Sequence, residues 1–251
     1  MSTAPSLAPP TAAAGPPASP GTTPTGPEAA DGRGFVPATL DLGDLVLRPW
    51  SPGLAVRGGA VASLTAAAAD PEIALWNPLR AADLVQARAC LDRWAAGWEN
   101  GSLGYFAILD AADAADTDAA DADAAGAELL GTIALRWTDR ADGLAMVGYW
   151  LLPAARGRGV ATRATRAITR WGFESAGARR IELAHAVDNP ASCRVAERCG
   201  FPLEGTLRES FRFGDGRHHD EHLHARLATD DVIADGTAGG GDADAGSGVR
   251  A

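Results

Sequence analysis

The sequence predicts one domain of the α/β class, built on a mixed β-sheet. Segments of strand type and helix type alternate along residues 41–230. Early strand pairs are joined by hairpin-type connections, and a helix follows the central strand before the next strand begins. The predicted order is a strand, two helices, three strands, a helix, a strand, a helix and two strands. A range of about 190 residues is long enough to bury one hydrophobic core.

The first half of this domain has recognisable start and stop signals. Asp83 and Gln86 resemble a capping box, and the apolar residues behind them repeat at helical spacing. Ser51 with Pro52 is a weaker helix-start signal, and the Ala/Asp-rich tract at 110–127 is expected to be a loop insertion in a hairpin. The expected elements are a strand at 43–50, a helix at 60–69, a loop at 70–78, a helix at 83–100 and a strand at 104–110.

The second half contains the clearest motif. Pro153 ends an apolar strand, and a helix with one apolar face starts near Val160. Asn189 with Pro190 gives a second helix start, and Gly200 ends that helix. The expected elements are strands at 128–137 and 144–152, a helix whose apolar face runs from 160 to 171, a strand at 179–187, a helix at 189–200, and strands at 203–213 and 219–228.

The ends of the chain and the distribution of its charge mainly argue against certain structures and partners. Residues 1–40 and 231–251 lack apolar periodicity, so we expect a disordered leader and a disordered tail. Of the net charge of -10, residues 1–40 carry -1, 110–128 carry -7 and 231–251 carry -3, which leaves +1 for the rest. This distribution predicts no nucleic-acid partner, and no apolar run is long enough for a membrane span. The three cysteines show no paired spacing, which favours reduced thiols in a cytoplasmic protein. The expected oligomeric state is a monomer or a homodimer.

The strand, turn and helix between Gly148 and Ala176 form a candidate phosphate site. Gly157 and Gly159 allow close backbone approach, and the first helical turn offers unpaired amide donors and partial positive charge. The chain contains no lysine, which excludes a Walker loop, and Thr162 stands where a dinucleotide fingerprint needs its third glycine.

The run Arg156-Gly157-Arg158-Gly159-Val160-Ala161 resembles the acetyl-CoA motif of the GNAT superfamily of N-acetyltransferases, Arg/Gln-x-x-Gly-x-Gly/Ala. The preceding Gly-Tyr-Trp-Leu, the later run from Asp188 to Ser192, and Cys199-Gly200-Phe201 are similar to its ribosomal-protein-alanine N-acetyltransferase branch. The resemblance covers residues 41–230 and implies a GNAT-like three-layer fold. It also implies transfer of acetyl from acetyl-CoA to a primary amine, such as a protein N-terminal α-amine.

The resemblance implies a role for individual residues. It implies Ser192 as the group that protonates the departing thiolate, although a hydroxyl at that position of a helix can also support the cap. Met146 occupies the position of a glutamate base, so Glu182 and His185 are the substitutes, and Trp76 either touches the acceptor or packs under its loop. The implied cofactor-binding residues are Trp150, Leu151, Leu152, Arg156, Gly157, Arg158, Gly159, Val160, Ala161 and Asn189.

Two further interpretations concern metal and mechanism. His222 and His224 share a strand face, but the sequence implies no distant third ligand, so we expect no metal site.

The alternatives to protein N-terminal acetylation are acetylation of a small amine (antibiotic, polyamine or amino acid) and a catalytically silent acyl-CoA-binding module, which Met146 favours. A weaker alternative is an interaction protein whose acidic tract recruits basic partners.

Overall fold

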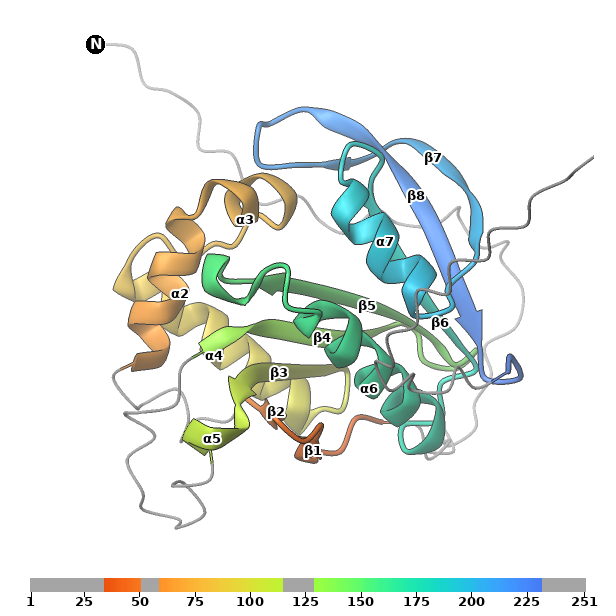
Figure 1. Cartoon of the computed structure of the whole chain (residues 1–251), viewed down its shortest axis with the longest axis horizontal. Helices are drawn as coiled ribbons and strands as arrows, with labels where there is room; N and C mark the ends of the chain where they lie inside the picture. Colours follow the sequence, from red (N-terminus) through yellow and green to blue (C-terminus); the bar gives the residue numbers. More distant parts are fainter. Residues whose placement is uncertain (1–33, 51–58, 115–128, 232–251) are drawn as a thin grey trace, which may run out of the picture. The chain divides into compact units, whose positions relative to one another are not determined.

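An eight-stranded mixed sheet organises the computed structural model, which describes residues 34–50, 59–114 and 129–231 (Figure 1). The strand order is β1-β2-β3-β4-β5-β6-β8-β7, and all neighbours are antiparallel except β5 and β6. The strands are β1 Leu40–Asp41, β2 Leu45–Pro49, β3 Leu103–Asp110, β4 Leu129–Asp139, β5 Leu144–Leu151, β6 Arg180–Ala186, β7 Leu203–Arg212 and β8 His218–Leu227.

Helices cover both faces of this sheet, which gives three layers. In Figure 1, α6 lies in front of the central strands and α4 behind them. The helices are α2 Gly59–Ala69, α3 Pro71–Trp76, α4 Leu84–Glu99, α5 Ala111–Ala114, the 3-10 helix η2 Pro153–Ala155, α6 Val160–Glu174 and α7 Pro190–Arg198. The predicted mixed α/β class is therefore confirmed.

The structure adds four elements to the predicted order: β1, α3, α5 and η2. The loop expected at 70–78 is wrong for residues 71–76, because Asp70 and Pro71 start a helix. The Asp70 carboxylate accepts the Ile73 amide at 2.9 Å, and Pro71 occupies the first turn, where a missing N–H costs nothing. Of the acidic tract, 111–114 are helical, while 115–127 and the Ser51–Pro52 signal lie outside the described residues.

Two hydrophobic clusters, one on each face, hold the layers together. The α6 face packs Trp171 against Phe106 with ring centroids 5.3 Å apart, and Phe35 stacks on Trp137 at 4.7 Å. On the other face, Trp94 of α4 packs against the sheet, and its ring stacks on that of Tyr105 with centroids 3.9 Å apart. Phe35 is 2% exposed, so the residues that pack in the core begin before residue 41.

The parallel pair β5 and β6 separates soon after it forms. Its register consists of Leu144 with Arg180, Ala145 with Ile181 and Met146 with Glu182. Beyond these pairs β5 continues to Leu151 and β6 to Ala186 without a shared register. The divergence leaves the second half of β5 without a strand partner on one side, and this is where the site lies.

Candidate functional site

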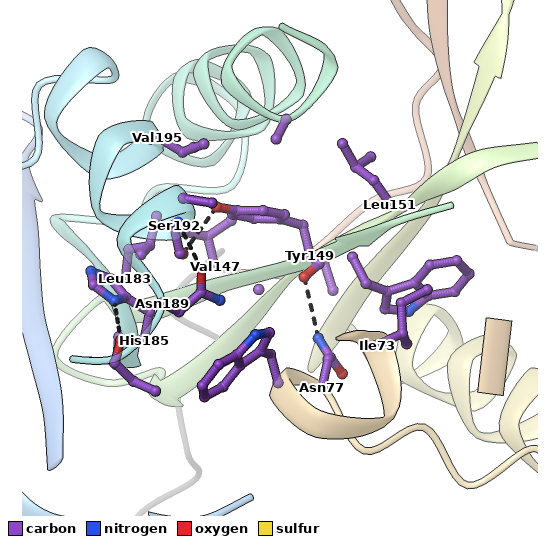
Figure 2. Close-up of a pocket in the computed structure, with 18 of the residues that line it drawn as sticks. Ile73, Asn77, Val147, Tyr149, Leu151, Leu183, His185, Asn189, Ser192 and Val195 are labelled. Atoms are coloured by element: carbon purple, nitrogen blue, oxygen red, sulfur yellow. Dashed lines mark hydrogen bonds between the residues drawn. The ribbon is translucent and has the colours of Figure 1, made fainter. Parts of the chain in front are cut away.

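A cleft of about 710 Å³ follows the line along which β5 and β6 separate. One part is lined by β5, the start of α6 and α7, and the other by the end of α3 and the β7–β8 hairpin. The close-up in Figure 2 shows Tyr149 between Ser192 of α7 and Asn77 at the end of α3. The cleft therefore extends through the sheet and is bordered by elements from both of its faces.

The start of α6, residues 156–161, forms the side of this cleft that is suited to phosphate groups, called the phosphate wall below. Gly157 and Gly159 have φ angles of 73° and 75°, a left-handed conformation that favours glycine, and a Cβ on either would meet nothing within 4 Å. Gly159 is the N-cap of α6 and gives no side-chain hydrogen bond to the first turn. The helix start thus presents amide donors, partial positive charge and open space, the three features that suit a pyrophosphate.

Arg156 lies at this wall, but its guanidinium is committed to other groups. It donates to Asp70 at 2.5 Å and to the Leu151 carbonyl at 3.1 Å, and it pairs with Glu72 at 2.8 Å. Although burial opposes ionisation of Asp70, the bond from Arg156 holds the pKa of that carboxyl below its ordinary value. Arg156 therefore ties the start of α3 to the end of β5.

Most of the predicted cofactor residues meet at the cleft. Two do not line it: Leu152, whose amide bonds Leu130 of β4, and the exposed Arg158. Those that line it are Trp150, Leu151, Arg156, Gly157, Gly159, Val160, Ala161 and Asn189, together with Ser192.

The open edge of β5 presents backbone donors to the cleft. The Asn77 side chain donates to the Tyr149 carbonyl at 3.3 Å (Figure 2). In an antiparallel ladder the N–H and C=O of one residue point to the same side, so the Tyr149 amide also faces away from β4. The Leu152 amide, three residues further on, points the opposite way and donates to the Leu130 carbonyl of β4, as the alternation of an extended strand requires. Asn77 was not anticipated, because it is 72 residues from its partner in the sequence.

Two hydroxyl groups meet across the cleft. The Ser192 Oγ lies 3.0 Å from the Tyr149 Oη, and burial raises the pKa of Tyr149 to about 12. The Asn189 side chain caps α7 by accepting the Ser192 amide at 3.2 Å. The Ser192 hydroxyl is therefore directed to Tyr149, while its amide takes part in the cap. Tyr149 was missed as a partner of Ser192, although it lies in the Gly-Tyr-Trp-Leu segment.

Neither substitute base presents a suitable atom to the cleft. Glu182 pairs with Arg180 at 3.0 Å and does not line the cleft. His185 lines it, but its Nδ1 bonds the Ala186 carbonyl at 2.8 Å and its Nε2 faces His224 at 3.3 Å. Burial also lowers the pKa of His185. Among the described residues, the carboxylates that line the cleft are those of Glu72 and Glu221.

Aromatic side chains form the wall opposite α6. Trp76 meets Phe213 edge-on with centroids 5.7 Å apart, and Phe211 meets Phe213 at 4.9 Å. The Gly214 amide donates to the Leu75 carbonyl at 2.9 Å, which ties the β7–β8 hairpin to α3. Trp76 thus both packs against the hairpin and lines the cleft, so the two readings of this residue are compatible.

A mixed sheet that opens beside a glycine-rich helix start defines an acyltransferase type of domain. Residues 44–202 match the family described as Acetyltransferase (GNAT) domain, so the chain belongs to the GNAT family of N-acetyltransferases. Enzymes of this family use acetyl-CoA as the cosubstrate.

Part of the chain is also similar to curated relatives. The chain is 35% identical over 99 residues to the ribosomal-protein-serine acetyltransferase of Escherichia coli, which covers 39% of this chain and 55% of that protein. The chain spans about half the length of the curated relatives that it matches.

Two solved structures share the fold. The ribosomal-protein-S5-alanine acetyltransferase of Vibrio fischeri has a TM-score of 0.63 at 20% identity over 77% of this chain and 98% of that one. The ribosomal L7/L12 α-N-protein acetyltransferase RimL, in complex with coenzyme A, has a TM-score of 0.62 at 19% identity over 76% of this chain and 98% of that one. Within the described part of the chain, no helix is long and apolar enough to cross a membrane.

The Asp70 contact predicts a pH-dependent loss of stability. Because the pKa of Asp70 is lowered from 3.8 on folding, its charge stabilises the fold above pH 3.8, and this contribution disappears as the pH falls through the lower, folded pKa. Asp70→Asn keeps a capping side chain but removes the charge. We expect it to lower the free energy of unfolding by about 1 kcal/mol at pH 7, and by less in acid, in urea titrations at both pH values.

Glu72→Gln is the matched control. Its carboxylate pairs with the same guanidinium but is 66% exposed, so we expect a loss of less than about 0.5 kcal/mol. An Asp70→Asn deficit that grows as the pH falls would contradict this role of the carboxylate.

Proposed function

We propose that the protein is an acetyl-CoA-dependent N-acetyltransferase that transfers the acetyl group directly to a primary amine. The observation that carries this proposal is the separation of β5 from β6 beside the open start of α6. A helix start with accessible amides suits the pyrophosphate, and an unpaired strand edge suits an extended arm that bonds backbone groups. Membership of the GNAT family supports the same function.

In this proposal the cosubstrate lies along β5. The amides between Arg156 and Ala161 hold the pyrophosphate, and the arm runs past Leu151 towards Tyr149. The Tyr149 amide, which faces away from β4, donates to the thioester carbonyl and stabilises the oxyanion of the tetrahedral intermediate. The amine nitrogen attacks the carbonyl carbon, the C–S bond breaks, and CoA leaves as a thiolate.

The Ser192 and Tyr149 hydroxyl groups are placed to assist the leaving thiolate. The pKa of Tyr149, about 12, lies far above that of a thiol, about 8.5. Full proton transfer from Tyr149 to the thiolate is therefore uphill, and the pair acts by hydrogen bonding. In this scheme Ser192 donates to sulfur while it accepts from Tyr149, and the final proton on sulfur comes from the acceptor amine.

Glu221 is our candidate to take the proton from the acceptor ammonium. Its carboxylate lines the cleft and accepts a hydrogen bond from the Ser210 hydroxyl at 2.8 Å. The other lining carboxylate, Glu72, is paired with Arg156. Glu221 also lies on β8 two residues from His219, whose ring meets that of Trp76 edge-on with centroids 6.3 Å apart.

The acceptor that we propose is the N-terminal α-amine of a protein. The names of the relatives, which acetylate ribosomal proteins, support this class. The end of α3 and the β7–β8 hairpin border the half of the cleft that would receive this amine.

Binding of acetyl-CoA is the first prediction. In calorimetry the full chain is expected to bind acetyl-CoA and CoA, but not NAD. Gly157→Glu places a side chain and a negative charge at the phosphate wall, and it should weaken binding at least about tenfold. Gly43→Glu is the control, because Gly43 has a φ of 85° and equally open surroundings but lies outside the cleft. Equal weakening by both variants would show backbone strain instead of a lost site.

The hydroxyl pair gives the second prediction. Ser192→Ala should lower kcat by about a hundredfold and Tyr149→Phe by about tenfold, because the second variant leaves the Ser192 hydroxyl in place. The KM for acetyl-CoA should change little in either variant. Ser175→Ala, at the far end of α6, is the control. An unchanged kcat in Ser192→Ala would contradict the proposed assistance to the thiolate.

Choice of acceptor gives the third prediction. Release of free thiol from acetyl-CoA should be fastest with peptides that have a free α-amine, and blocking that amine should abolish it. Polyamines, aminoglycosides and free amino acids are the competing acceptors in the panel. Faster turnover of one of these would assign a small-molecule substrate, and binding of acetyl-CoA without turnover of any amine would indicate a silent binding module.

A further inference from the structure

Four metal-ligating side chains from three elements converge beside the cleft. Their ligand atoms all lie within 4.8 Å of one another. The residues are His185 of β6, Cys193 of α7, and His222 and His224 of β8.

The topology of the sheet explains this convergence. His185 is the register partner of His222, and the two-residue alternation of a strand places His224 on the same face of β8. Helix α7 covers this face and brings Cys193 over the three imidazoles. His185 and His224 are 5% and 1% exposed, so the cluster lies mostly in the interior.

Hydrogen bonds to the backbone fix the tautomers of two of these histidines. The His185 Nδ1 lies 2.8 Å from the Ala186 carbonyl oxygen, and the His224 Nδ1 lies 3.0 Å from the Phe201 carbonyl oxygen. A carbonyl oxygen only accepts, so each Nδ1 carries the hydrogen and each neutral ring has a bare lone pair on Nε2. These two Nε2 atoms face each other at 3.3 Å. Two lone pairs at this distance repel unless a proton or a metal ion lies between them.

Two of the distances between ligand atoms are also close to those of a tetrahedral metal site, and all of them lie within 4.8 Å. With Zn–N bonds of about 2.0–2.1 Å, two nitrogen ligands of one ion are about 3.3 Å apart, which is the separation of the His185 and His224 Nε2 atoms. The Cys193 Sγ lies 3.9 Å from the His224 Nε2, close to the spacing of about 3.6 Å that a Zn–S bond of about 2.3 Å requires. The His222 Nδ1 is buried without a hydrogen-bond partner among the described residues.

We propose that His185, Cys193, His222 and His224 bind a divalent zinc-type ion in a closed site of three nitrogens and one sulfur. On binding, the Cys193 thiol releases its proton to solvent and ligates as the thiolate. Backbone carbonyls that orient ligating histidines are the usual outer contacts of zinc sites. Four protein ligands leave no open coordination position, so the ion is structural. It fastens α7, which carries Asn189 and Ser192, to β6 and β8. The inference does not depend on acetyl transfer.

The test is a titration of the full-length, metal-free chain with Co²⁺ and with Zn²⁺. Cobalt should bind with a stoichiometry of one, with the intense visible bands of a tetrahedral ion and a near-ultraviolet band from sulfur ligation, and zinc should displace it. Zinc should also raise the melting temperature. Cys193→Ala should abolish the sulfur band and weaken cobalt binding at least about tenfold. His222→Gln, whose residue is only partly buried, should weaken binding while keeping the sulfur band.

The controls keep the proposal falsifiable if one variant misfolds. Cys90→Ala removes a cysteine in α4 outside the cluster, and His218→Gln removes an exposed histidine of β8. Both should bind cobalt as the parent chain does. The proposal is overturned if the parent chain shows no tetrahedral cobalt spectrum. It is equally overturned if folded Cys193→Ala keeps the sulfur band, or if Cys90→Ala loses it.

Discussion

The architecture depends on the incomplete pairing of β5 with β6. The two strands share a short parallel register and then separate, which exposes the edge of β5. Backbone groups at such an edge need partners. Side chains supply some of them, since Asn77, 72 residues away, bonds the Tyr149 carbonyl, and Arg156, in the following turn, bonds the Leu151 carbonyl. These contacts bring α3, the glycine-rich turn and β5 together around a cleft, and they leave amide donors of the edge for an extended ligand.

The three helices that begin around the cleft differ in whether a side chain caps their first turn. Asp70 caps α3 and Asn189 caps α7 with side-chain oxygens, so each of these helices satisfies an amide of its own first turn. Gly159 gives α6 no such cap. Among these three helix starts, the one left without a side-chain cap is therefore that of α6, beside the open edge of β5. The proposed metal site fits this division, because it fixes α7 while α6 stays open to the cosubstrate.

Local spacing was sufficient to predict the mixed sheet, the long helices and the turn at Gly157 and Gly159, because caps, glycines and periodicity are short-range signals. The contacts that define the chemistry are long-range. Tyr149 and Ser192 are 43 residues apart, and Arg156 and Asp70 are 86 apart. The sequence also could not show that β8 lies between β6 and β7, which is what brings His222 and His224 to His185. The helix α3 was missed because its signal, Asp followed by Pro, is also typical of a turn.

The central claim is that the start of α6 and the open edge of β5 bind one ligand together. Backbone amide NMR of the full chain, with acetyl-CoA added stepwise, tests it most directly. The account predicts that the amide resonances of Gly157, Gly159 and Val160 shift together with that of Tyr149, along one saturable curve, while those of β1 and β2 stay in place. Shifts confined to other surfaces, or shifts at α6 without any change at Tyr149, would contradict it.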